Sequence, residues 1–114
     1  MSATAPVDVV RAAFRAYLGQ DRAAIDRLLG EDYVFTSSQD DHIGKAGFLD
    51  RCFPTADRFA AHEILHLVDV GEGRVLVLYE YELTTGERYR NVERSTVRDG
   101  RLVETEVFFG GRVD

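Results

Sequence analysis

The chain has 114 residues, of which 45% are hydrophobic and 30% charged, as is ordinary for a globular domain. That length fits one domain, so residues 1–114 are expected to fold as a single unit. The net charge of −6 excludes most nucleic-acid partners, which need clustered basic side chains. The single cysteine, Cys52, rules out an internal disulfide and suits a reducing compartment. The sequence also offers no apolar run of signal-peptide or membrane-span length, so we expect a cytoplasmic protein that is not bound to a membrane.

Three helices are predicted in the first half of the chain. The first covers residues 4–18, with Thr4 as its cap and apolar side chains at three- and four-residue spacings. The second is short and begins after Asp21, which can cap it. A third spans about 44–53 and ends at Pro54.

Strands follow the helices. A first strand, Tyr33–Ser38, precedes the third helix, and four long strands end the chain: Arg58–Val70, Arg74–Thr84, Glu87–Arg98 and Arg101–Phe109. Helices first and strands afterwards predict an α+β fold, in which the helices cover one face of a largely antiparallel sheet. Strands this long must twist and curl, so the sheet and helices should enclose a pocket.

Turn residues predict how these strands pair. A two-residue loop at Thr85-Gly86 would place Glu80 opposite Asn91 and diagonal to Glu93. The last turn has two solutions. A two-residue Asp99-Gly100 loop opposes Arg98 to Arg101 and Glu93 to Glu106, whereas a three-residue loop over 98–100 pairs Glu93 with Thr105 and Arg94 with Glu104. We favour the longer loop because like charges that face each other across a ladder are destabilising.

This register divides the side chains between two faces of the sheet. The inward face is mostly apolar and consists of Leu76, Leu78, Glu80, Glu82, Tyr89, Asn91, Glu93, Ser95, Val103, Thr105, Val107 and Phe109. The outward face carries Tyr79, Tyr81, Arg90 and Phe108, and tyrosine and arginine are enriched at interfaces. We therefore expect a homodimer through the outward face, although the same composition also suits a solvated surface.

Glu80 and Glu93 are the candidate catalytic residues. A carboxyl group on an apolar concave face has its ionised form disfavoured, which suits it to proton transfer. The alternative is a structural network in which Tyr89 and Asn91 satisfy both carboxyls.

Other reactive side chains have simpler explanations, and we expect neither a metal nor a cofactor. Asp40, Asp41 and His42 are consecutive, so they are poorly placed to converge on one ion, and Asp41 can instead cap the third helix. His62 and His66 lie on a predicted strand, where their spacing only puts them on one face. Cys52, on an apolar helix face, is expected to be a buried structural thiol.

The order of these elements resembles the nuclear transport factor two-like superfamily almost end to end. DRAAIDRLLGEDYVFTSS is similar to the second helix and first strand of steroid isomerases and SnoaL-like polyketide cyclases. RYRNVERSTVRDGRLVETEVFFGG is similar to the final hairpin of SnoaL-like proteins, and FTSSQDDHI with FLDRCFP resembles small bacterial members. The resemblance implies a cone-shaped, cystatin-like fold with one pocket. It does not choose between isomerases, epoxide hydrolases, dehydratases, cyclases and binding modules.

Aligning the catalytic residues of the steroid isomerases with this sequence argues against steroid isomerase activity. Their general-base aspartate falls at Ser37, their oxyanion tyrosine at Ala13 or near Tyr17, and their second donor at Glu93 or one residue off. Because serine is a poor base, the resemblance implies no classical steroid isomerisation. It also places the strand face of Phe35 and Ser37 in the pocket, so that the predicted substrate-binding residues are Tyr17, Phe35, Ser37, Tyr89, Asn91 and Thr105.

These observations leave three hypotheses for function. The first is a domain that binds a mostly apolar small molecule and catalyses proton transfer, isomerisation, dehydration or cyclisation on it. The second is a binding or assembly module without catalysis, and the third is a partner protein that acts through its sheet face.

Overall fold

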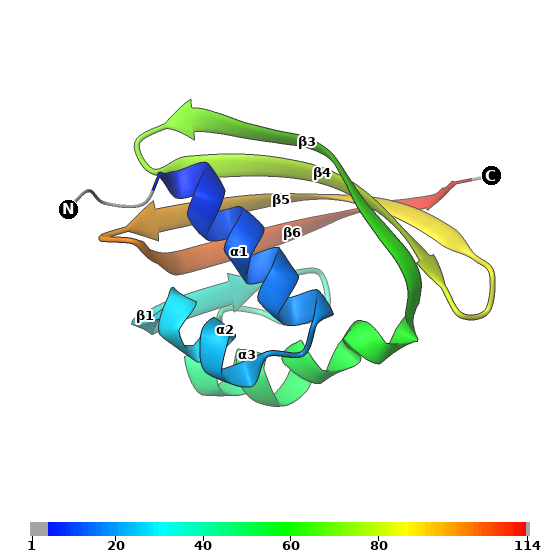
Figure 1. The fold of residues 1–114 in the computed structure, drawn as a ribbon, viewed down its shortest axis with the longest axis horizontal. Coiled ribbons are helices and arrows are strands. Elements are labelled where there is room, and N and C mark those ends of the chain that lie inside the picture. The colour runs from blue at the N-terminus through cyan, green and yellow to red at the C-terminus, as the bar shows by residue number, and fades with distance from the viewer. Residues whose placement is uncertain (1–4, 114) are drawn as a thin grey trace.

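The computed structural model describes residues 5–113. Four helical segments occur, namely α1 (Pro6–Leu18), α2 (Arg22–Leu28), α3 (Lys45–Arg51) and the 3-10 helix η1 (Phe53–Arg58). The six strands are β1 (Leu29–Thr36), β2 (Ile43–Gly44), β3 (Phe59–Gly71), β4 (Arg74–Leu83), β5 (Arg88–Arg98) and β6 (Arg101–Val113). Three α-helices thus pack on a curved, mostly antiparallel sheet, which confirms the predicted α+β class (Figure 1).

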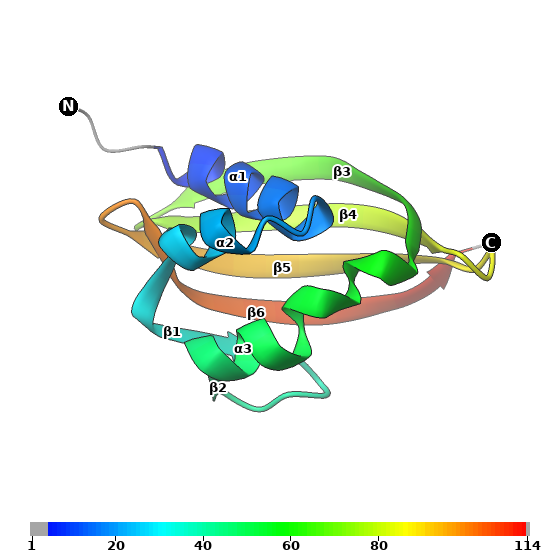
Figure 2. The ribbon, with the colours of Figure 1, turned by 60° about the horizontal axis from the view of Figure 1, so that its bottom comes forward.

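The strands form one sheet in the order β2-β1-β6-β5-β4-β3, in which only β1 and β6 run parallel. Figure 2 shows α1 and α2 lying over one face of the sheet, with α3 beside β1 and β2. The sheet bends around this helical layer without closing. Within residues 5–113, none of the helices has the length and apolar character needed to cross a membrane.

Helix α1 supplies the centre of the core. Its three- and four-residue spacing buries Val9, Val10, Ala13 and Ala16 against the sheet. Pro6 stands in its first turn, where the missing N–H costs nothing. The predicted cap, Thr4, lies outside the described residues.

The two short helices begin differently. The Asp21 carboxylate accepts a hydrogen bond from the Ala24 N–H at 3.1 Å, so its predicted capping of α2 is confirmed. The predicted Asp41 cap is wrong, because Gly44 directly precedes α3 without a side-chain cap and Asp41 instead contacts the His42 ring. Pro54 follows α3 as predicted, and the chain continues as η1.

The predicted β4–β5 register is wrong by one residue. Leu83 and Glu87 are joined by a backbone hydrogen bond of 2.8 Å, so the loop has three residues and Gly86 takes the left-handed conformation, with φ of 96°. Tyr79 is therefore opposite Asn91, and Glu80 is opposite Arg90. Each β4 side chain lies on the face opposite to the predicted one, because the side-chain period of a strand is two.

The preferred β5–β6 turn is also wrong. Asp99 and Gly100, with φ of 53° and 76°, form a two-residue turn that places Arg98 opposite Arg101. Both arginines are exposed, so water screens their repulsion. A register shift between Thr96 and Val97 then brings Arg94 opposite Glu106, which removes the Glu93–Glu106 clash that had counted against this turn.

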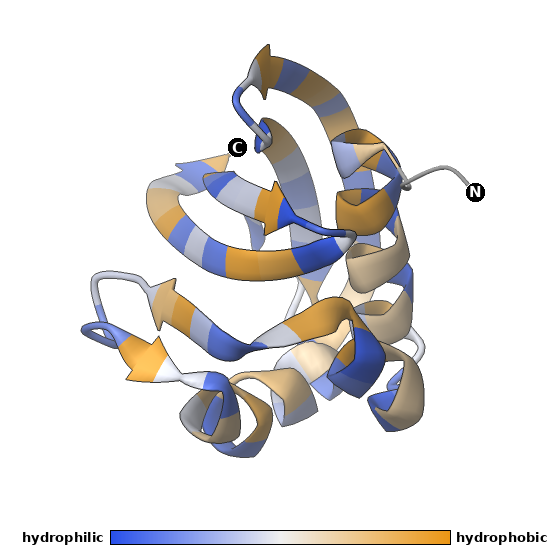
Figure 3. Cartoon of the chain, turned by 90° about the vertical axis from the view of Figure 1, so that its left-hand side faces the viewer, coloured by the Kyte–Doolittle hydropathy of each residue, from blue (hydrophilic) through white to orange (hydrophobic). Residues whose placement is uncertain are grey.

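These registers define the true inner face of the sheet. Tyr79 and Tyr81, predicted to face outward, point into the concavity, whereas Glu80 faces outward and forms ion pairs with Arg88 and Arg90. Asn91, Glu93, Ser95, Thr105, Val107 and Phe109 face inward, as predicted. Alternating hydrophobic and hydrophilic bands along the strands make this two-faced pattern visible in Figure 3.

Candidate functional site

A cavity of about 270 Å³ lies between the concave face of the sheet and the helices, just below the usual size range of ligand pockets. Most of its wall is aromatic or aliphatic. The aromatic side chains that line it are Phe14, Tyr17, Tyr33, Phe35, Phe48, Phe59, Tyr79, Tyr81 and Phe109.

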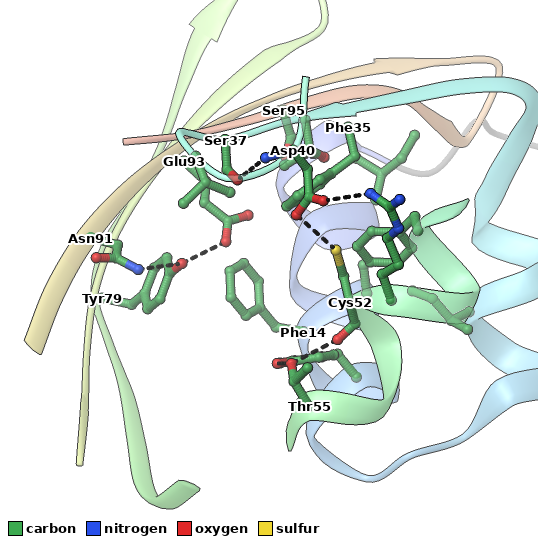
Figure 4. Close-up of a pocket in the computed structure, with 18 of the residues that line it drawn as sticks. Phe14, Phe35, Ser37, Asp40, Cys52, Thr55, Tyr79, Asn91, Glu93 and Ser95 are labelled. Atoms are coloured by element: carbon green, nitrogen blue, oxygen red, sulfur yellow. Dashed lines mark hydrogen bonds and ion pairs between the residues drawn. The ribbon is translucent and has the colours of Figure 1, made fainter. Parts of the chain in front are cut away.

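A chain of hydrogen bonds crosses the sheet wall of this cavity. The Tyr79 hydroxyl donates to Glu93 Oε2 at 2.7 Å, and Asn91 Nδ2 donates to the Tyr79 oxygen at 3.2 Å. Asn91 is itself oriented by the Gly110 N–H, which donates to its Oδ1 at 3.4 Å. In Figure 4 the three side chains lie together on neighbouring strands, with the carboxyl of Glu93 directed toward the cavity. This network thus directs the Glu93 carboxyl into the cavity, while its other members, Tyr79 and Asn91, are buried.

The surroundings of Glu93 favour its protonated form. Its remaining accessible surface faces the cavity, and desolvation raises the pKa of the carboxyl to about 7, against the lowering effect of the Tyr79 hydrogen bond. Burial and the neighbouring Glu93 also raise the pKa of Tyr79, so the tyrosine remains a neutral donor. At neutral pH Glu93 can both accept and release a proton.

Aromatic rings hold Tyr79 in place. The His62 ring stacks on it at a centroid distance of 5.0 Å, and Phe14 meets it edge-on at 5.3 Å. Burial lowers the pKa of His62 to about 4, so this ring is uncharged at neutral pH and acts as another aromatic neighbour.

A second polar part of the wall comes from the β1–β2 loop and the end of α3. The Ser37 hydroxyl accepts from the N–H groups of Gln39 and Asp40, which shapes the loop. Asp40 in turn forms an ion pair with Arg51 at 3.1 Å and accepts a long contact from Cys52 Sγ at 3.9 Å. Figure 4 shows Asp40 and Cys52 directed toward each other, with Tyr79 and Asn91 across the view from Cys52. Burial, with Asp40 nearby, raises the pKa of the Cys52 thiol to about 11, so it is not a thiolate at neutral pH.

The third polar part of the wall joins α1 to η1. The hydroxyl groups of Tyr17 and Thr55 lie 2.7 Å apart, and Thr55 Oγ1 donates to the Cys52 carbonyl at 2.7 Å. Burial raises the pKa of Tyr17; the Thr55 bond and nearby Arg58 act against this rise, and Glu93 adds to it. Tyr17 therefore lies within electrostatic reach of both Arg58 and Glu93.

The structure brings most of the predicted site residues together. The cavity wall includes Glu93, Tyr17, Phe35, Ser37, Asn91 and Thr105. Glu80 and Tyr89 are not in that wall. Glu80 is on the outer face with its two arginines, so the prediction that both glutamates share a cavity wall is wrong, and Tyr89 stacks on Tyr81 at 5.6 Å.

Several wall residues were missed by sequence reasoning. Tyr79 and Tyr81 would have been found if the loop at Gly86 had been counted as three residues. Asp40, Arg51 and Arg58 reach the cavity from a loop and short helices, and no periodic pattern in the sequence indicates this. Among residues 5–113, no three side chains of His, Cys, Asp or Glu gather in a way that could hold a metal ion.

Comparisons with known proteins agree with this architecture. A protein from Kribbella flavida DSM 17836 is 22% identical, with a TM-score of 0.84 over 94% of this chain and 88% of that one. IdmH from Streptomyces antibioticus, a proposed polyketide cyclase, is 18% identical, with a TM-score of 0.73 over 94% and 93% of the two chains. An LEH-like epoxide hydrolase from M. tuberculosis is 20% identical, with a TM-score of 0.73 over 94% and 84%. At these identities the likeness is one of fold, and a search of curated proteins found no match.

The sequence itself carries the family assignment. A family model for the SnoaL-like domain matches residues 10–105, from within α1 to the first half of β6. Together with the NTF2-like structural neighbours, this match identifies the chain as a member of the SnoaL-like domain family.

Proposed function

We propose that the cavity binds a small, mostly apolar molecule and that Glu93 exchanges a proton with it. The observation that carries this proposal is a carboxyl group in an aromatic-lined cavity, held by Tyr79 and with its pKa raised to about 7. A group with such a pKa is partly ionised at neutral pH and is therefore suited to acid–base work. Isomerisation, dehydration and cyclisation are the reaction classes that need only this chemistry.

The geometry supports a division of roles among the wall residues. The Tyr79 hydroxyl donates its hydrogen bond to Oε2 of Glu93, so Oε1 is the carboxyl oxygen available to a ligand. The rings of Phe14, Phe35 and Tyr81 provide apolar surface for the body of the molecule. Tyr17 and Ser95 are further polar groups within the wall. Glu80 is assigned no role, because it lies outside the cavity.

The alternative is a binding module without catalysis. The hydrogen bonds from Asn91 to Tyr79 and from Tyr79 to Glu93 favour it, because they satisfy polar groups that would otherwise be left buried and unpaired. In this case Glu93 would only bind the ligand.

The test uses 5-nitrobenzisoxazole, an aromatic molecule that reports proton abstraction by colour. An ionised Glu93 would take the proton from the ring carbon as the C–H electron pair forms the nitrile and the N–O bond breaks to release a coloured phenolate. We expect a rate that rises to a plateau above about pH 7 and falls by at least about 100-fold in Glu93→Gln.

Glu63→Gln is the matched control, because Glu63 is an exposed β3 residue that does not line the cavity. It should leave the rate unchanged. If Glu93→Gln keeps the wild-type rate while the molecule still binds, the role in proton transfer is wrong and the binding module is favoured.

We also propose that the protein is a homodimer in the cytoplasm, paired through the outer face of the sheet. Phe108 and Leu76 are 54% and 37% exposed on that face, and a single cysteine suits a reducing compartment. With Tyr79 and Tyr81 facing inward, exposed apolar side chains on this face are the remaining support for pairing.

A further inference from the structure

We infer that the ligand of this cavity carries one anionic group, such as a carboxylate on an apolar ring, which Arg58 binds at the cavity mouth while the ring extends toward Glu93. This inference rests on the proposed function and narrows its substrate class.

The position of Arg58 is the first step. Arg58 ends η1, lines the cavity and is exposed, so this residue lies where the cavity meets solvent. Its Nε donates to the Thr55 carbonyl at 3.3 Å. This bond anchors one edge of the guanidinium to the helical turn and leaves the two terminal nitrogens as a planar pair of donors. Such a pair matches the two oxygens of a carboxylate.

The second step is the local charge balance. Two arginines, Arg51 and Arg58, line the cavity. Arg51 is neutralised by Asp40 at 3.1 Å, whereas no carboxylate among residues 5–113 lies within ion-pair distance of Arg58. The mouth therefore holds one unbalanced positive charge in a chain whose net charge is −6. Other exposed arginines, such as Arg27 and Arg101, also form no ion pair with the residues that the structure describes, but only Arg58 among these three lines the cavity.

The third step is the placement of Arg58 and Glu93 in the wall of the same cavity. Tyr17 interacts electrostatically with both Arg58 and Glu93, and all three residues line the same cavity. Arg58 and Glu93 therefore belong to the wall of one cavity of about 270 Å³. One small molecule can therefore span them, with its anion at Arg58, its apolar body against Phe14 and Phe59, and its reactive end at Glu93.

A matched pair of fluorescent probes tests this inference. 1-Anilinonaphthalene-8-sulfonate carries one negative charge, and N-phenyl-1-naphthylamine has the same rings without it. We expect the anionic probe to bind about tenfold more tightly than the neutral one. High salt should weaken the binding of the anionic probe and have almost no effect on the binding of the neutral one.

The variants isolate Arg58. Arg58→Gln should lower the affinity for the anionic probe about tenfold and change the affinity for the neutral probe by less than about twofold. Arg27→Gln, an exposed α2 position outside the cavity, makes the same change in net charge and should affect neither probe. Equal weakening of both probes in Arg58→Gln, or no weakening of the anionic probe, would overturn the inference.

Amide chemical shifts locate the probes. Shifts at Asn91 and Thr105 place a probe in the cavity, whereas shifts confined to Phe108 and Leu76 place it on the outer face and contradict the inference. If both probes bind in the cavity with equal affinity, the inference of an anionic ligand is wrong and the proposed function is unaffected. Failure of both probes to enter the cavity would count against the proposed function itself.

Discussion

Glu93 accepts one hydrogen bond, from Tyr79, in a cavity whose wall is mostly aromatic and aliphatic. Two effects act on its pKa in opposite directions. Desolvation raises it, and the donated hydrogen bond lowers it, with desolvation the larger of the two. The chemistry of the site therefore responds to changes in its neighbours as well as in the carboxyl itself.

Removing the Tyr79 hydroxyl should move the pKa of Glu93 further upward. In Tyr79→Phe the desolvation stays and the stabilising donor is lost, so the carboxyl should titrate above the wild-type value of about 7. Carboxyl ¹³C NMR measures this directly. Tyr81→Phe is the control, since Tyr81 lines the same cavity without a hydrogen bond to Glu93, and an equal shift in both variants would refute the assignment.

The pH dependence of the free energy of unfolding should distinguish the contribution of Glu93 from that of His62. The folded-state pKa of Glu93 is raised, from 4.5 to about 7, so its contribution is present below pH 4.5 and is lost as pH rises toward 7. The full shift corresponds to up to ~3 kcal/mol. The pKa of His62 is lowered, from 6.5 to about 4, so its contribution is present above pH 6.5 and is lost as pH falls toward 4.

Between pH 4.5 and 6.5 the two contributions oppose each other, and the wild type should show a weak slope there. In Glu93→Gln the His62 effect is no longer opposed by that of Glu93, so the free energy of unfolding should rise more steeply with pH across this range than in the wild type. His62→Phe should show the reverse slope. Urea unfolding at several pH values measures both, and parallel curves for the wild type and Glu93→Gln would contradict the burial of an ionisable Glu93.

At the level of secondary-structure elements, the pairing of β5 and β6 positions the site. Gly110 lies at the register shift between Arg90 and Asn91, and its N–H orients Asn91. A Cβ at Gly110 would stand 2.4 Å from the Arg90 carbonyl oxygen, which is backbone and has little freedom to yield.

Gly110→Ala should therefore lower the free energy of unfolding by about 2 kcal/mol. It should also disturb Asn91, and through Tyr79 the titration of Glu93. Gly44→Ala is the matched control, because the nearest atom to its Cβ is 4.0 Å away, and it should change stability by less than about 0.5 kcal/mol. Equal stability of the two variants in urea would show that β5 and β6 are not held this closely.

Element order could be predicted from the sequence, but strand register could not. Apolar spacing and the residues Pro54, Gly86 and Gly100 mark where elements begin and end. Register depends on one residue more or less in a loop, which Thr85-Gly86 does not reveal, and on a bulge at Thr96 that has no distinct composition. Glu93 was correctly assigned to the concave face because its own strand kept the predicted alternation, whereas Glu80 lies on the strand that slipped.

At the level of the whole molecule, the sheet has one face committed to the cavity and one that carries exposed apolar groups. Phe108 and Leu76 lie on the outer face beside ion pairs such as Arg94 with Glu106. If this face pairs two copies, the protein should sediment at twice the 12.8 kDa of one chain.

Phe108→Glu should shift the sedimentation of the protein to that of a single chain, because it places a charge in the apolar contact. Leu18→Glu, an exposed apolar position at the end of α1, should leave the dimer intact. A wild type that sediments as a single chain at micromolar concentration would contradict pairing. Such a result would leave the cavity and its chemistry untouched, since every residue in that wall comes from one chain.

We propose that Glu93 holds a titratable proton in the cavity near neutral pH. A carboxyl ¹³C titration that compares the wild type with Glu93→Gln tests it most directly. We expect one wild-type resonance to titrate near pH 7 and to be absent from the variant, while other carboxyls titrate at lower pH. A wild type in which every carboxyl titrates below about pH 5, as free side chains do, would contradict the account.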